Sequence, residues 1–174
     1  MTSNQTGRLI GAIFGLVFVL ANAGALPTAA AVPVCVLGIA SFIWLFVALR
    51  RVRTPPAGGG GGAAPRRFGR SFFLVVAAEI AVALAGFLVV NLVFHAPQAA
   101  VPWLSLVVGL HFFGLAAIWH MPSLRLLAAS MAACGAAGLV LAACGASPAV
   151  IATASGIAPG ALLLGSVWWS LRTP

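Results

Sequence analysis

The fold of this chain is decided by the stretch FFLVVAAEIAVALAGFLVVNLVF at residues 72–94, which contains a single charged side chain, Glu79. A helix rises about 1.5 Å per residue, so about 20 apolar residues are enough to cross a hydrocarbon core about 30 Å thick. The stretch also lacks the alternation of polar and apolar residues that a membrane-spanning strand needs. Residues 72–94 are therefore predicted to form a transmembrane helix.

Five other runs have similar length and composition. Together the six predicted spans cover residues 9–26, 29–49, 72–94, 101–119, 124–143 and 150–171. The breaks between them hold prolines that end helices locally, at Pro27, Pro97, Pro122 and Pro148. We predict an all-α, polytopic transmembrane bundle that forms a single domain over residues 1–174 and is surrounded by the lipid bilayer. The first run also resembles a cleavable signal peptide, and in that interpretation five spans remain.

The composition excludes several classes of protein. Of the 174 residues, 63% are hydrophobic and 6% are charged, whereas a soluble domain has roughly 25% charged residues. With no Asp and a single Glu, the chain cannot supply paired carboxylates, a carboxylate-rich metal site or a Ser-His-Asp triad. His95, His111 and His120 fall at different depths, which disfavours paired haem ligands. We therefore expect no enzyme activity, no metal and no cofactor.

The nine arginines determine the expected orientation, because short loops rich in Lys and Arg stay in the cytoplasm. Arg8 precedes the first span, Arg125 begins the fifth and Arg172 ends the sixth. The other six lie between the second and third spans, at Arg50, Arg51, Arg53, Arg66, Arg67 and Arg70. Six spans with both termini cytoplasmic place every arginine on one side. The abundance of Ala, Arg and Gly favours a bacterial source, and hence the bacterial cytoplasmic membrane.

Residues 51–70 form the one long connection, a flexible cytoplasmic linker rich in Gly, Pro and Arg. Its arginine cluster has two interpretations. It is either a topology signal attached to a spacer, which we favour, or a contact for anionic lipid headgroups, at about 1 kcal/mol per basic residue. Nucleic-acid binding is not expected, because no folded module accompanies the arginines.

One acid and one histidine lie near the centres of the predicted spans. Glu79 is close to the centre of the third span, and His111 is close to the centre of the fourth, which runs in the opposite direction. Counting about 1.5 Å per residue places both at nearly the same depth. A charge there costs about 2.5–3.5 kcal/mol, so each group needs a partner. Glu79 and His111 are our candidate polar intramembrane site, either for sharing a proton or for a structural hydrogen bond.

The sixth span contains a candidate helix break at Gly156, Pro159 and Gly160. Transporters expose backbone groups at such breaks, although a plain kink is the alternative. Small residues at helical spacing also predict packing seams, or a homo-oligomer interface. These residues are Gly11 and Gly15 in the first span, Ser130, Cys134 and Gly138 in the fifth, and Ala152, Gly156 and Gly160 in the sixth.

The cysteines carry two interpretations. Cys35 and Cys144 both fall in the outer part of their spans, so a disulfide between them is conceivable in an oxidising compartment. Packing as small apolar side chains is favoured for them and for Cys134.

The segment VVGLHFFGLA at residues 107–116, followed by His120, Met121 and Pro122, resembles a segment of uncharacterised bacterial multi-pass membrane proteins of similar size. Those proteins have a Gly-Leu-His-Phe run, here residues 109–112, then Leu-Ala and a proline at the cytoplasmic turn. The resemblance covers about residues 85–172. It departs at Gly114, where the family has proline, and at residues 119–120, where the family has a more polar turn. It implies a small helical membrane protein and no particular activity.

Two functions remain open from the sequence. The first is proton-linked transport of a small solute through the buried Glu79 and His111 site. The alternative is a non-catalytic accessory or scaffold protein of the membrane that acts through helix–helix contacts.

Overall fold

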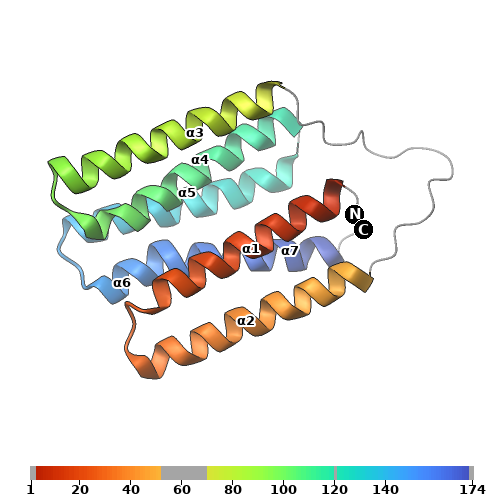
Figure 1. Cartoon of the computed structure of the whole chain (residues 1–174), viewed down its shortest axis with the longest axis horizontal. Helices are drawn as coiled ribbons and strands as arrows, with labels where there is room; N and C mark the ends of the chain where they lie inside the picture. The colour runs from red at the N-terminus through yellow and green to blue at the C-terminus, as the bar shows by residue number, and fades with distance from the viewer. Residues whose placement is uncertain (1–2, 52–69, 120, 173–174) are drawn as a thin grey trace.

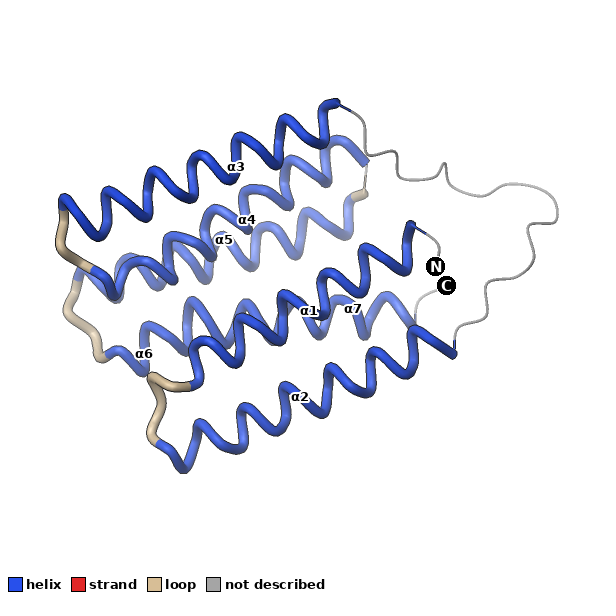
Figure 2. The backbone as a smooth tube through the Cα atoms, in the orientation of Figure 1, coloured by secondary structure: helices blue, strands red, loops and turns tan. Residues whose placement is uncertain are grey.

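The structure, a computed structural model, describes residues 3–51, 70–119 and 121–172, and all regular structure in these ranges is helical. The main helices lie side by side (Figures 1 and 2). They are α1 (Ser3–Ala23), α2 (Thr28–Arg51), α3 (Arg70–Leu88), α4 (Ala100–Trp119), α5 (Pro122–Ala143), α6 (Pro148–Ala152) and α7 (Ala158–Arg172). The π-helical segment η1 (Val89–Val93) extends α3, the 3-10 helix η2 (Pro97–Ala99) leads into α4, and the π-helical segment η3 (Thr153–Ile157) joins α6 to α7.

The prediction of an all-α bundle of six spans is confirmed. Six helices in the described ranges are long and apolar enough to cross a membrane, as in a multi-pass membrane protein. The sixth is the continuous element Pro148–Arg172, which contains α6, η3 and α7. Most of the predicted linker, residues 52–69, lies outside the described residues.

The two ends of the bundle differ in chemistry. One end, called the arginine end here, holds the described arginines that lie near helix termini: Arg8, Arg50, Arg51, Arg70, Arg125 and Arg172. Figure 1 shows the start of α1 and the end of α7 at this end. The opposite end, called the turn end, holds the short connections at residues 24–27, 94–96 and 144–147. The first and last described helices therefore begin and end on the same side of the bundle, as the predicted topology requires.

Two pairs of helices pack most closely, α4 with α5 and α1 with α7. Between α1 and α7, a Cβ atom on Gly15 would lie 2.9 Å from the carbonyl oxygen of Gly160. Between α4 and α5, a Cβ atom on Gly109 would overlap the backbone of Ala132, and one on Gly135 would overlap the backbone of Leu106. Lipid tails are as apolar as the side chains, so such backbone contact provides much of the association energy.

The predicted seams through Gly15 and Gly160 are confirmed. Gly138 of α5 packs against Ser155, and Gly156 packs against Asn22. These contacts join the sixth span to both α5 and α1, so it lies at the centre of the bundle.

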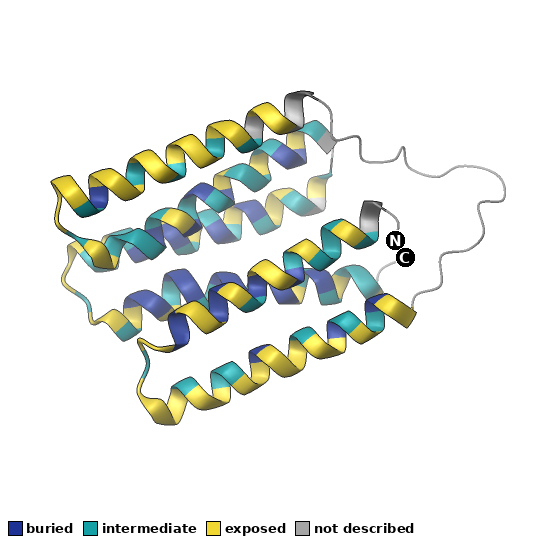
Figure 3. Cartoon of the chain, in the orientation of Figure 1, coloured by how far each residue is buried: buried dark blue, intermediate teal, exposed yellow. Residues whose placement is uncertain are grey.

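In contrast, α2 and α3 lie at the periphery. The α2 helix packs against α1 and α7, and α3 packs almost entirely against α4. Only 6% of the α3 span is buried, and Figure 3 shows this helix mostly in the colour of exposed residues. Most of the α3 surface is therefore left for lipid or for a partner.

Candidate intramembrane polar site

Glu79 of α3 and His111 of α4 meet inside the spans. The imidazole Nδ1 of His111 lies 2.6 Å from the carboxylate Oε2 of Glu79. The side chain of His111 is 14% exposed and that of Glu79 is 19% exposed. The contact has the distance of an ion pair without the angular geometry of a hydrogen bond, and the buried Nδ1 has no hydrogen-bond partner among the residues that the structure describes. The structure therefore brings together the two ionisable residues that depth counting selected.

The register between α3 and α4 is fixed by an indole that fills the space left by a glycine. A Cβ atom on Gly86 would overlap the ring of Trp103. The indole Nε1 of Trp103 donates a hydrogen bond to the carbonyl oxygen of Ala83, at 3.3 Å. Since Gly86 follows Glu79 by two helical turns, this contact holds the carboxylate at the depth of His111.

Chemically, the pair consists of one proton acceptor and one group that can donate or accept. Glu79 is the only acid of the chain, so His111 contacts the only carboxylate side chain available. The His111 ring also packs edge-on against Phe112, with 5.8 Å between the ring centroids. An apolar setting strengthens the attraction between opposite charges, and it also makes an unpaired charge costly.

A hollow of about 790 Å³ lies between this site and the turn end. Val82 and Gly86 line it from α3, Trp103 lines it from α4, and Phe94 and Gln98 line it near the turn. Val82 is one helical turn from Glu79. The hollow therefore extends from the turn end to within about one turn of the pair.

The candidate helix break takes the form of a π-helical turn. Pro159 has no N–H and cannot donate to the carbonyl of Ser155, and η3 ends two residues before it, at Ile157. The backbone N–H of Ala158 bonds instead to the carbonyl of Thr153. The chain stays helical through Gly156, Pro159 and Gly160, which are all buried. These residues lie in the packed centre of the bundle, and they line neither the hollow near Val82 nor the one between α2 and α7.

The other candidate residues lie apart from the pair. His95 is exposed in a turn, with a left-handed φ of 48°. His120 lies outside the described residues. Cys35, Cys134 and Cys144 are free thiols, so the conceivable disulfide between Cys35 and Cys144 is not formed.

Sequence reasoning missed three buried polar residues in the spans. Asn22 donates from Nδ2 to the carbonyl of Phe18 at 2.8 Å, and Ser155 donates to the carbonyl of Ile151 at 2.7 Å. Ser105 is fully buried, and its hydroxyl has no hydrogen-bond partner within the described part of the chain. Each is a polar residue in an apolar run. That pattern indicates that the side chain is buried, but it does not identify the helix against which the side chain packs.

Comparisons with family models, curated proteins and solved structures find no match for this chain.

Proposed function

We propose that this membrane protein carries out proton-linked transport of a small solute and that Glu79 and His111 form the proton-carrying site. The observation that carries the proposal is the 2.6 Å contact between Glu79 Oε2 and His111 Nδ1 within the spans. A carboxylate and an imidazole at this distance can share or exchange a proton.

The cost of the pair supports a chemical role. Placing a charged side chain at mid-span costs about 2.5–3.5 kcal/mol. Uncharged polar residues can sit in a span at lower cost, and the chain uses them elsewhere: the amides of Asn22 and Asn91 bond to carbonyls of their own helices. An ionisable pair is therefore an expensive choice for packing alone.

The surroundings of the pair support movement of a solute. The hollow between Val82 and the turn end offers space on one side of the site. The α3 helix packs almost entirely against α4, so it can shift without disturbing the contacts of α5 or α7. Protonation of Glu79 would remove the charge that attracts His111 and would weaken the α3–α4 contact. This links proton binding to the position of α3.

The test is flux into liposomes. Proton flux, and uptake from a panel of small solutes, are measured for the wild type, Glu79→Gln and His111→Ala, with thermal stability in detergent measured on the same samples. Ser130→Ala is the matched control, because Ser130 is a span residue whose hydroxyl bonds to its own helix. We expect a flux that falls at least about tenfold in both site variants and is unchanged in the control. Absence of flux in the wild type, or full flux in Glu79→Gln, would refute the proposal.

One observation favours the alternative function, an accessory or scaffold protein. Because 6% of the α3 span is buried, most of this helix is available to a partner helix or to a second copy. In that case the pair holds α3 in place, and Glu79→Gln reduces assembly in native mass spectrometry or cross-linking while no flux is present in any sample.

A further inference from the structure

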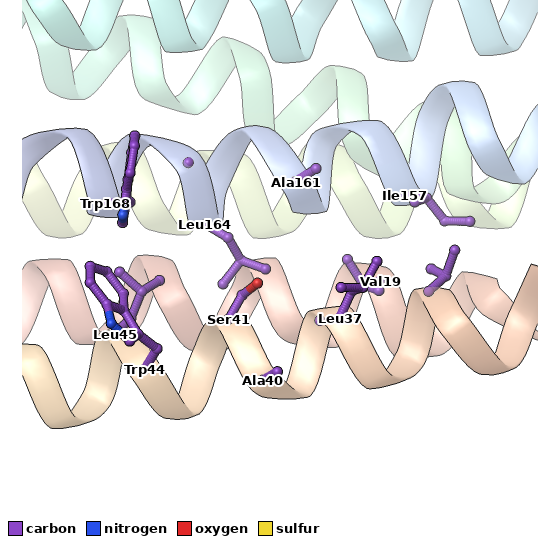
Figure 4. A pocket seen from close by; sticks show the side chains of 13 residues that line it. Val19, Leu37, Ala40, Ser41, Trp44, Leu45, Ile157, Ala161, Leu164 and Trp168 are labelled. Atoms are coloured by element: carbon purple, nitrogen blue, oxygen red, sulfur yellow. The ribbon is translucent and has the colours of Figure 1, made fainter.

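A second hollow lies on the side of the bundle opposite the Glu79 and His111 pair. It is a groove of about 780 Å³ between α2 and the sixth span, with α1 at its base. Leu37 and Trp44 line it from α2, and Ala161 and Trp168 line it from α7, as Figure 4 shows. Val19 of α1 forms part of the base. Nearly all of the groove surface is therefore apolar, and one side of it is open.

The groove has the length of one lipid leaflet. On α2 its lining runs from Val34 to Leu45, and on the sixth span it runs from Ile157 to Trp168. Each stretch is about 16 Å long at about 1.5 Å per residue, and half of the hydrocarbon core is about 15 Å. An extended acyl chain lying along the helices matches this length.

Basic side chains surround the groove at the arginine end. Trp44 and Trp168 line the groove at this end, and the guanidinium of Arg172 lies 3.6 Å from the ring centroid of Trp168. On α2, the guanidinium of Arg50 lies 4.4 Å from the ring centroid of Phe46. These stacking contacts hold two guanidinium groups near the membrane boundary.

The helix ends that carry these arginines are packed together. Leu49, the residue before Arg50, belongs to a buried hydrophobic cluster, and Leu171, the residue before Arg172, packs against that cluster. Arg8 of α1 joins the same end of the bundle, because its Nη2 donates to the carbonyl of Ser170 at 2.7 Å. Three helices thus each contribute a cation at the arginine end of the bundle, and Arg172 contacts the groove directly through Trp168.

We propose that the groove binds one anionic phospholipid, with an acyl chain between α2 and α7 and the headgroup phosphate at Arg50 and Arg172. The apolar lining and its length select a lipid chain, and the cations select a negative headgroup. Arginine suits this role because its planar fork can form paired hydrogen bonds to a phosphate. This proposal does not depend on the transport function.

A glycine in the groove permits a sharp test. Gly165 lines the groove, and a Cβ atom on it would meet no atom within 4 Å, so a side chain there starts in open space. Gly165→Leu replaces a poor helix former by a good one, so the lipid-free Tm should not fall. Ala137→Leu adds an apolar side chain at an exposed position of α5 and is the matched control. Arg50→Gln combined with Arg172→Gln removes the cations and keeps the apolar groove.

The experiment uses the purified full chain in detergent. Its Tm is followed on titration with phosphatidylglycerol and with phosphatidylcholine of the same acyl chains, and native mass spectrometry counts retained lipids. For the wild type and Ala137→Leu we expect phosphatidylglycerol to raise the Tm by about 3–6 °C at ten times Kd, and phosphatidylcholine to act about tenfold more weakly. We expect Gly165→Leu to lose the shift with both lipids. The double arginine variant should lose the preference for phosphatidylglycerol.

Three results would overturn the proposal. Equal shifts with both lipids in the wild type would show that the headgroup charge is not recognised. A full phosphatidylglycerol shift in Gly165→Leu would place the lipid outside the groove. A wild-type dimer that Gly165→Leu converts to a monomer would show that a second copy of the chain, and not a lipid, occupies the groove.

Discussion

In a double-mutant cycle that replaces Glu79 and His111 by leucine, the double variant should be more stable than either single variant. In Glu79→Leu or His111→Leu, the remaining ionisable group loses a partner that was 2.6 Å away. A charge at mid-span costs about 2.5–3.5 kcal/mol, and the side chains, 14% and 19% exposed, can recover part of this cost by rotating toward the headgroups. We therefore expect each single substitution to lower the free energy of unfolding by about 2 kcal/mol.

The double variant removes both ionisable groups and leaves an apolar contact between two helices. Its free energy of unfolding should lie within about 1 kcal/mol of the wild type, which gives a coupling energy of about 3–5 kcal/mol. The assay is reversible unfolding in mixed micelles of a nonionic detergent and dodecyl sulfate, followed by circular dichroism. Glu79→Leu combined with Ser130→Leu should be additive, because Ser130 bonds to its own helix on α5. Additive behaviour of Glu79→Leu and His111→Leu would show that the two side chains do not interact in the folded protein.

Three further predictions concern packing and topology. A Cβ atom on Gly160 would lie 2.7 Å from a backbone oxygen of α1, so Gly160→Ala should destabilise the bundle by about 1–3 kcal/mol. Gly165→Ala should be neutral or stabilising by up to about 1 kcal/mol. Thermal melts that rank the two variants the other way would contradict the packing of α1 on α7. Gly86→Ala should lower the Tm by several degrees because the new methyl group overlaps the Trp103 indole. If the indole is the cause, Gly86→Ala should lower the Tm by less when it is made in the Trp103→Ala variant, measured in the same melts. Cys144 is a free, exposed thiol near the turn end, so a membrane-impermeant maleimide should label it when added on the side of the membrane that faces the turn end. Labelling only from the side that faces the arginine end would disprove the six-span topology.

The number and limits of the spans could be predicted because they depend on local properties. Each apolar run is about as long as the hydrocarbon core is thick, or longer, and prolines such as Pro122 and Pro148 stand at N1 or N2 of the helices that follow them. The proximity of Glu79 and His111 also followed from local information, since a short turn joins their spans and depth can be counted along each helix. The actual contact requires the correct rotation of both helices, which the Gly86 and Trp103 packing supplies.

Contacts between distant helices could not be predicted in this way. The chain has 20 glycines, so small-residue spacing occurs in most spans and does not identify a partner. Gly109 and Gly135 make the closest approaches between α4 and α5, yet the spacing rule selected Gly138 and its neighbours. The groove is formed by α2 and α7, which are far apart in the chain and meet because both pack on α1. Its apolar lining gives no signal in the sequence beyond that of any span.

The peripheral position of α3 also has a consequence for how the protein is made. Since α3 packs almost entirely against α4, Glu79 has no helix to meet until the next span has been synthesised. His111 follows it by roughly 30 residues, and at about 5–20 residues per second the acid waits about 2–6 s for its partner. During that interval the ribosome is still extending the chain, and α3 has to enter the bilayer with a solitary carboxyl group. Of the six spans, α3 should therefore be the one whose insertion into the bilayer depends most on how fast the following residues, 95–119, are translated.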